Sequence, residues 1–393
     1  MRMTVIEQIL DLARWAPSGD NTQPWRFEVA GPDHVVVHAF DTRRHCVYDV
    51  EGQASQLSVG ALLETMRIAA SAHGRALRFV RRPDAPDEAP LIDVWLDEAP
   101  RLSPDPLLAV VKLRSVQRKP LSTRPLTTAE KGWLESAVGP GYSVVWFEGG
   151  RERLRLAWLA VRSAKIRLTI PEAYAVHREI IEWDARYSLD RVPDQALGAD
   201  PLSLRSMRWA MASWGRVELM NRFFGGTLMP RLQLDFIPGL RCAAHFAIVA
   251  RSNPAGIDDQ LAAGVAVQRF WLTATALQLQ LQPQYTPLVF ARYSRTATAF
   301  TAVESARRRA DVVRAMMAAL LGKEAAERTV FLGRLGKGPA AAARSLRLPL
   351  EQLRWRADEA SARRGATVAS RTAVNDGVAI PDASRGHRSS KRV

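Results

Sequence analysis

A short loop near the N-terminus concentrates the side chains best suited to hold a small planar molecule. Residues 16–25 read APSGDNTQPW, and two prolines and a glycine surround Ser18, Asn21 and Gln23. Because the prolines restrict the backbone, the hydroxyl and the two carboxamides would be fixed donors and acceptors that lose little entropy on binding. From the residues alone, an ordinary capped turn anchored by Trp25 is the simpler interpretation.

Cysteine and histidine do not form a recognisable reactive cluster in the sequence. The two cysteines, Cys46 and Cys242, are too few for a metal cluster or a disulfide framework, and we expect both to be small buried residues. The seven histidines show no HExxH or paired pattern. We therefore predict no protein-bound metal site.

A helix and two strands are predicted to hold the loop from either side. Residues 4–15 have helical spacing, and the expected packing face consists of Val5, Ile9, Leu12 and Trp15. Residues 25–40 predict two short strands around a Gly-Pro-Asp turn. The loop would thus join the end of a helix to the start of a sheet.

Later segments predict two halves of mixed secondary structure. The region 99–107 concentrates three prolines and a serine and is the predicted seam. Thr127 and Glu130 fit a capping box at the start of a helix. The other expected elements are helices over 56–74 and 258–280, strands over 77–82, 91–98, 143–147 and 245–251, and a largely helical stretch over 151–235.

Two helical segments echo one another at an offset of 204 residues. GALLETMRIAASA (60–72) and GVAVQRFWLTATA (264–276) each begin with glycine, carry Glu64 or Gln268 four residues on, and end in alternating alanines. Small residues along one stripe allow two helices to approach closely. The echo suggests two related halves packed around a pseudo-two-fold axis.

Composition and charge restrict the class of protein. Hydrophobic residues make up 47% of the 393, with no apolar run long enough to cross a bilayer, and Glu7 and Asp11 interrupt the N-terminal apolar run. We therefore expect a cytoplasmic protein without membrane contact. The net charge of +15 comes from arginines spread along the chain, many beside acids as in 178–186, so we expect anionic small molecules rather than nucleic acid as partners.

The N-terminal loop resembles a known family signature. APSGDNTQPWRF is similar to the APSxxNxQPW signature of the nitroreductase-like FMN proteins, and residues 39–70 resemble the next region of their tandem, single-chain branch. In that family the loop contacts FMN from one subunit while the other subunit holds the phosphate. The resemblance implies that Pro17, Ser18, Asn21 and Gln23 contact FMN.

A second motif resembles the family's arginine-rich RxSxR-type opening. In Arg114-Ser115-Val116-Gln117-Arg118 the hydroxyl is displaced by one position. Guanidinium groups four residues apart could share one face and bind phosphate oxygens bidentately, with Ser115 adding a hydroxyl. A surface helix with scattered arginines is the alternative.

Two further segments resemble the end of the family's fold. Residues 331–353 are similar to its closing strand and basic segment, which implies a phosphate contact from Arg344 or Arg347. Residues 281–287, LQPQYTP, lie where the family brings backbone against the flavin ring, so Gln282 and Gln284 could touch its edge. An ordinary polar loop is the alternative for this segment.

The resemblance implies an α+β, nitroreductase-like fold, in which two tandem halves form a pseudo-dimer with mixed antiparallel sheets flanked by helices. Residues 1–100 would form the first half and residues 107–353 the second, with a helical insert over 151–235. The insert could be a lid, with Tyr174, His177 and Trp183 as candidate pocket-facing groups. Residues 354–393 are expected to be a disordered basic tail.

The implied function is that of an FMN-dependent oxidoreductase. Hydride would pass from NAD(P)H to a small electron-poor acceptor, such as a nitro compound or a quinone, and the flavin rather than a catalytic side chain would carry the chemistry. The chain would act as a monomeric pseudo-dimer or as a homodimer. The alternatives are a protein that binds or sequesters FMN without turnover, and an accessory protein in a molybdopterin-type cofactor pathway, a label attached to a similar subgroup.

Overall fold

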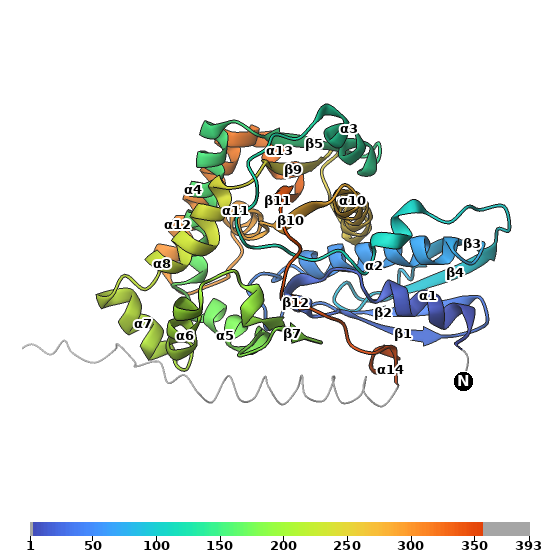
Figure 1. Ribbon diagram of the computed structural model, residues 1–393. Coiled ribbons are helices and arrows are strands. Elements are labelled where there is room, and N and C mark those ends of the chain that lie inside the picture. Colours follow the sequence, from blue (N-terminus) through green and yellow to red (C-terminus); the bar gives the residue numbers. More distant parts are fainter. Residues whose placement is uncertain (1–2, 357–393) are drawn as a thin grey trace, which may run out of the picture. The chain divides into compact units, whose positions relative to one another are not determined.

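The first sheet contains the strands that follow the N-terminal loop (Figure 1). The computed structural model describes residues 3–356. The strand order is β1-β2-β4-β3, and all pairs are antiparallel. The bounds are β1 Trp25–Val29, β2 His34–Ala39, β3 Arg75–Arg81 and β4 Leu91–Glu98. The hairpin predicted over 25–40 and the strand predicted over 91–98 are confirmed.

The second sheet has the order β10-β11-β9-β5 and is also antiparallel. Its bounds are β5 Tyr142–Phe147, β9 Ala244–Ala250, β10 Leu279–Pro283 and β11 Thr329–Lys337. All seven residues of β9 are buried, because helices and loops cover both faces of this central strand. Helices combined with antiparallel sheets make the α+β class that the sequence predicts.

Two long helices cross at a very close approach, α2 (Gln53–Ser71) and α10 (Ile257–Ala276), as Figure 1 shows. A Cβ on Gly60 would lie 2.1 Å from the carbonyl oxygen of Leu261, and one on Gly264 would lie 2.1 Å from that of Leu57. The two echoed segments therefore pack on one another through their glycines. The arrangement of the whole chain as two tandem halves remains a prediction.

The N-terminal helix packs with a different face from the one predicted. Helix α1 (Val5–Ala13) starts at a capping box formed by Thr4 and Glu7, and it buries Ile6, Ile9, Leu10 and Ala13. Val5 is exposed and Leu12 and Trp15 are only half-buried. The periodicity marks a helix correctly, but this short segment has apolar residues on adjoining faces, and tertiary packing selects between them.

A second helical group covers the other sheet and forms its own core with β9 and β11. Helix α4 packs against α11 and α12 in this core. The predicted helical insert, which begins at residue 151, would include this helix. The capping box predicted at Thr127 is present at α3. The bounds are α3 Thr128–Ala137, α4 Gly150–Arg167, α9 Ile237–Leu240, α11 Thr286–Thr296, α12 Glu304–Leu321 and α13 Lys323–Arg328.

The stretch between α4 and β9 projects to one side as short helices and two-residue strands (Figure 1, green). The helices α6 to α8 bury none of their residues, so they do not form a core of their own. We call residues 200–236 the lid segment. The bounds are α5 Pro171–Ile180, β6 Ile181–Glu182, β7 Tyr187–Ser188, β8 Val192–Pro193, η3 Asp194–Ala196, α6 Pro201–Ala210, α7 Trp214–Phe223, α8 Leu228–Arg231 and the π-helical turn η4 Leu232–Phe236.

The closing segment returns to the first sheet. Strand β12 (Arg344–Ser345) pairs in parallel with β7, and α14 (Leu350–Leu353) packs near α1 and β1. Leu350 and Leu353 enter the same hydrophobic core as α1 and α2. The tail predicted as disordered lies, apart from residues 354–356, outside the described residues.

Candidate functional site

One cavity of about 710 Å³ brings together most of the residues predicted as cofactor contacts. Its size lies within the range that accommodates cofactors and drug-sized ligands. Nine of the ten predicted residues line it: Pro17, Ser18, Asn21, Arg114, Ser115, Arg118, Gln284, Arg344 and Arg347. The tenth, Gln23, is fully buried and does not line the cavity. That these residues contact a cofactor remains a prediction.

The N-terminal loop has an unusual backbone. Asp20, Asn21 and Gln23 adopt left-handed conformations, with φ values of 49°, 63° and 47°. Such conformations cost free energy outside glycine, least for Asn and Asp, so surrounding contacts must hold them. The Ser18 hydroxyl oxygen accepts from the Gln23 backbone N–H at 3.0 Å, which closes the loop on itself.

The two carboxamides of the loop hold it against other segments. Asn21 Nδ2 donates to the carbonyls of Leu189 and Arg191, at 3.1 and 3.2 Å. Gln23 Nε2 donates to Leu189 O at 2.9 Å, while Gln23 Oε1 accepts from the Leu348 N–H at 2.9 Å. The structure thus gives Gln23 a supporting position behind the loop, because both ends of its amide are bonded to protein.

Three arginines converge on one end of the cavity. Arg347 donates to Ala16 O through Nε and Nη2, at 3.0 and 2.9 Å, and to Asn21 Oδ1 at 2.9 Å. Arg344 donates to the backbone oxygens of Lys112 and Arg114, both at 3.0 Å. Arg114 donates to Trp15 O at 3.1 Å. The C-terminal segment thereby clamps a loop 331 positions earlier in the chain.

These three arginines carry charge without a nearby acid. Within residues 3–356, none of Arg114, Arg344 and Arg347 lies within 4.0 Å of a carboxylate oxygen, and the Nε groups of Arg114 and Arg344 are buried without a hydrogen-bond partner. Burial lowers the pKa of each, and repulsion from neighbouring arginines adds to the effect at Arg114 and Arg347, so that the pKa of Arg347 falls to about 9. A bound anion would reduce the repulsion between the arginines and would accept hydrogen bonds from the unsatisfied Nε groups.

The segment from Arg114 to Arg118 is extended, not helical. Val116 forms a parallel bridge with Leu281, and the Gln117 N–H donates to Leu281 O at 3.0 Å. Pro120 lies two positions after Arg118 and disfavours helical backbone at Lys119, the residue just before it. In an extended chain, residues four apart are roughly 13 Å apart. Arg114 and Arg118 therefore serve different parts of the cavity instead of sharing one helical face.

Arg118 lies near Asp20 rather than in the arginine cluster. Its Nη1 donates to Ala196 O at 3.0 Å, and the Asp20 carboxylate acts on its charge. Burial raises the pKa of Asp20 to about 6, although Arg118 partly offsets the effect and Asp49 adds to it. Asp20 was not predicted as a site residue, although it lies within the recognised loop.

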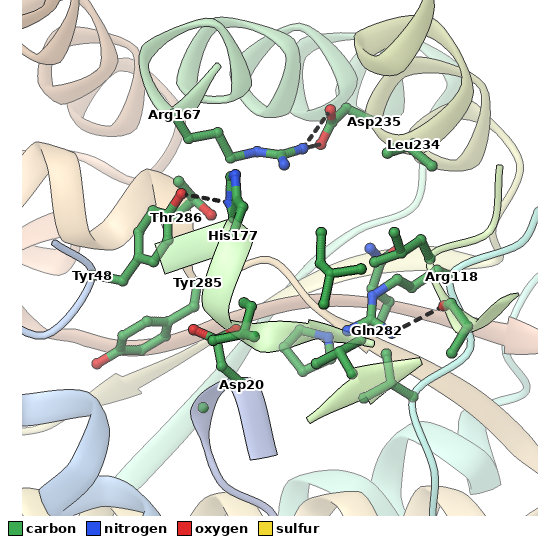
Figure 2. Close-up of a pocket in the computed structure, with 18 of the residues that line it drawn as sticks. Asp20, Tyr48, Arg118, Arg167, His177, Leu234, Asp235, Gln282, Tyr285 and Thr286 are labelled. Carbon is green, nitrogen blue, oxygen red and sulfur yellow. Dashed lines mark hydrogen bonds and ion pairs between the residues drawn. The ribbon is translucent and has the colours of Figure 1, made fainter. Parts of the chain in front are cut away.

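A group of polar side chains lines the cavity near the lid segment (Figure 2). Tyr48 Oη lies 2.9 Å from His177 Nε2, and Arg167 pairs with Asp235 at 3.0 Å. Burial, together with the nearby Arg167, lowers the pKa of His177 to about 3, so the ring is neutral. Burial also lowers the pKa of Arg167, but the Asp235 carboxylate outweighs it and raises the pKa overall.

Sequence patterns indicated only part of this polar group. Of the three pocket-facing candidates in the insert, His177 lines the cavity, whereas Tyr174 and Trp183 do not. Tyr48, Arg167 and Asp235 were missed, because they come from separate elements and no local spacing connects them.

The segment 282–284 lines the cavity, but its side chains are held by the protein. Gln284 Oε1 lies 2.7 Å from His245 Nδ1, and His245 Nε2 lies 2.7 Å from Gly239 O. Gln282 Oε1 accepts from Arg334 Nε at 2.7 Å, and Arg334 Nη2 also donates to the backbone oxygens of Arg118 and Lys119. Both glutamines therefore fix the cavity wall, and contact with a ligand remains a prediction for Gln284.

Metal binding and membrane crossing find no support in the part of the chain that the structure describes. No three side chains among His, Cys, Asp and Glu gather there in a way that could hold a metal ion. None of the helices over residues 3–356 combines the length and the apolar character that crossing a bilayer requires.

Comparison with known proteins gives one match to a family model and several relatives from Mycobacterium tuberculosis. Residues 2–58 match the model of the Nitroreductase family. In Mycobacterium tuberculosis H37Rv, the uncharacterised protein Rv3127 is 29% identical over 202 residues, which is 49% of this chain and 57% of the relative. From the same strain, Rv3131, named as a candidate NAD(P)H nitroreductase, is 26% identical over 292 residues, 73% of this chain and 78% of the relative.

A third relative in that strain, Acg, also named as a candidate NAD(P)H nitroreductase, is 33% identical over 129 residues, 31% of this chain and 37% of the relative. The chain therefore spans just over half the length of Rv3127 and about a third of Acg. The family match contains the loop with Ser18 and Asn21. Together with the α+β fold, these matches show that the chain is similar to the nitroreductase-like proteins, most clearly over its N-terminal loop.

Proposed function

We propose that the cavity binds FMN and that the chain is an FMN-dependent oxidoreductase, transferring hydride from NAD(P)H to a small electron-poor acceptor such as a nitro compound or a quinone. The observation that supports this most strongly is the cluster of the buried Arg114 and Arg347 and the half-buried Arg344, which lies beside the family's signature loop and has no carboxylate within 4.0 Å among residues 3–356. The name of Rv3131, a candidate NAD(P)H nitroreductase, points the same way.

The arginine cluster fits the phosphate of a flavin nucleotide. Guanidinium groups bind phosphate oxygens through directed N–H donors, and a buried charge without a partner is costly. The free Nε groups of Arg114 and Arg344 supply such donors, whereas most of the Arg347 donors are used on Ala16 and Asn21. We assign Arg114 and Arg344 to the phosphate and Arg347 mainly to holding the loop in place.

The remaining residues would position the ring and exclude water. Ser18 accepts from Gln23 N–H, which leaves its hydroxyl proton available to a ligand. Arg118 would add positive charge where negative charge builds up on the reduced ring. When bound, FMN supplies the redox chemistry itself, and the protein contributes orientation and electrostatics.

The first test measures FMN affinity by quenching of flavin fluorescence. Arg114→Ala and, separately, Asn21→Ala should each weaken binding at least about tenfold, because each removes charged or buried hydrogen bonds. Arg114→Lys should fall between, since it keeps the charge but loses the planar fork. The control is Arg101→Ala, at an exposed arginine outside the cavity. Unchanged affinity in both alanine variants would refute the assignment.

A second candidate function is storage of FMN without turnover. The observation that favours it is the lid segment, whose residues Met207, Met211 and Met220 line the cavity and could restrict access to it. Visible spectra under anaerobic NADH or NADPH distinguish the two functions. A flavin spectrum that bleaches supports the oxidoreductase, and one that persists with both donors supports storage.

A further inference from the structure

The lid segment presents an apolar turn to the solvent. Between α7 and α8, residues 223–229 read FFGGTLM, and four large side chains point outward: Phe223 is 65% exposed, Phe224 69%, Leu228 61% and Met229 52%. We call residues 223–229 the apolar turn. It lies on the projecting side of the molecule in Figure 1, at the left.

Such a turn is unusual for a chain surrounded only by water. Turns at a protein surface are normally polar, and contiguous exposed apolar side chains mark contact sites. Gly225 adopts a left-handed φ of 59°, and the Gly226 N–H donates to Met220 O at 2.8 Å, so the turn is folded back on α7 by its own hydrogen bonds. The exposure is thus a feature of an ordered turn.

Positive charge flanks the apolar turn on both sides. Residues 223–230 carry no charge, and they stand between Arg222 and Arg231. Arg222 lies over the Phe223 ring at 5.3 Å. The lid segment, residues 200–236, carries five arginines and three acids, Asp200, Glu218 and Asp235, and Asp235 is paired with Arg167. This combination of exposed aromatic residues with flanking arginines is complementary to a surface that is apolar inside and anionic outside.

We propose that the apolar turn inserts into the headgroup region of an anionic lipid bilayer, with Arg222 and Arg231 on the lipid phosphates. The chain would bind the surface peripherally, which requires no helix that spans the membrane. A second copy of the chain fits less well. A symmetric contact through the same turn would place Arg222 and Arg231 against their own copies, and residues 223–230 between them carry no acid to offset the repulsion.

Binding in this way would bring the cavity to the lipid surface. Phe224 and Met229 belong to the apolar turn and also line the cavity. An apolar electron acceptor dissolved in the bilayer could therefore enter without crossing water. The membrane contact itself does not depend on the proposed oxidoreductase activity, so the two proposals can fail independently.

The test is flotation of the full chain with lipid vesicles. Binding is expected to vesicles of phosphatidylcholine mixed with phosphatidylglycerol, and only weakly to phosphatidylcholine alone. The double variant Phe223→Ser/Phe224→Ser should lose most of the bound fraction, since interfacial binding scales with apolar area. Arg222→Gln should weaken binding to the anionic vesicles about fivefold.

The matched control replaces two apolar residues that are as exposed as Phe223 and Phe224 but lie outside the apolar turn. Leu113 and Trp133 are 65% and 66% exposed and lie outside the lid segment, so Leu113→Ser/Trp133→Ser should keep full vesicle binding. Equal loss in the control, or no binding of the unmodified chain to anionic vesicles, would overturn the proposal. Light scattering after size exclusion tests whether the turn contacts a second copy of the chain instead. If the unmodified chain is a dimer that does not bind vesicles, and Phe223→Ser/Phe224→Ser makes it a monomer, the turn is a contact between two copies and the membrane proposal is wrong.

Discussion

Asp20 is the acidic side chain of the N-terminal loop and lines the cavity that we propose binds FMN. It lines the cavity between Arg118, which lowers its pKa, and Asp49, which raises it, and Cys46 and Tyr48 also lie within its electrostatic reach. Burial dominates and brings its pKa to about 6. The ionised carboxylate therefore destabilises the folded chain at neutral pH.

Replacing Asp20 by asparagine should stabilise the protein in a pH-dependent way. The folded pKa is raised above the unfolded value of 3.8, so the penalty is complete above pH 6 and disappears as the pH falls below about 4. Asp20→Asn, which also tolerates the left-handed backbone, should increase the free energy of unfolding by about 1 to 2 kcal/mol at pH 8. Urea unfolding at pH 8 and pH 5 measures this. A gain that does not shrink at pH 5 would contradict the explanation.

At the scale of residues, most of the predicted site residues line the cavity, although they form only a small part of its wall and some of their roles were misassigned. The loop motif and the two arginine segments lead to eight lining residues, because those residues are fixed by short patterns. Gln23 belongs to the same loop motif but does not line the cavity, and Asp20 occupies an undefined position of that motif. A motif gives the identity of a loop, whereas the direction of each side chain depends on backbone angles such as the positive φ of Gln23.

At the scale of elements, the crossing of α2 and α10 is the tightest contact. Around it, the buried Glu64 carboxylate pairs with Arg269 at 2.7 Å, and Gln268 Nε2 donates to Thr65 Oγ1 at 2.9 Å. Gly60 and Gly264 have backbone atoms where any side chain would have to fit. Neither helix can move aside without breaking these polar contacts.

Adding one methyl group at the crossing should be severely destabilising. The new Cβ of Gly60→Ala would meet the Leu261 carbonyl at 2.1 Å, so the helices must separate, at a cost of about 3 kcal/mol or more. Gly132→Ala is the control: this glycine lies inside α3 with no atom within 4 Å of the added carbon, and it should gain about 0.5 to 1 kcal/mol. Thermal unfolding of both variants gives the comparison, and equal stability would contradict the close packing.

Sequence patterns predicted elements better than they predicted pairing between elements. The hairpin over 25–40 and the capping box at Thr127 depend on neighbouring residues, and both are present. The backbone of 114–118 could not be foreseen, because its extended form depends on pairing with Leu281, far along the chain. The buried face of α1 likewise depends on the helices and strands that cover it.

At the scale of the whole molecule, two neutral histidines lie within the fold. His245 connects β9 to Gln284 and Gly239, and burial lowers its pKa to about 4. His177 contacts Tyr48, with a pKa of about 3. Both values lie below the ordinary value of 6.5, so acid protonates the unfolded chain first.

Global stability should therefore fall between pH 6.5 and pH 4. Each histidine should contribute a loss of up to about 2 kcal/mol by pH 5. The variant His245→Gln should unfold with a flatter pH dependence than the unmodified chain, whereas a change at the exposed His45 should leave the slope as it is. Denaturant unfolding at several pH values measures the slopes. A His245→Gln variant with the same pH dependence as the unmodified chain would show that the ring is not held neutral.

The hydrogen bonds from Arg347 to Ala16 have a consequence for the order of events during synthesis. Ala16 is made before Arg347, and more than three hundred residues separate the two in the chain. Until Arg347 is made the signature loop lacks its clamp, and until Arg344 is made it is absent from the cluster with Arg114. A nascent chain should thus be unable to hold the proposed ligand, and loading should follow synthesis of the segment that carries Arg344 and Arg347.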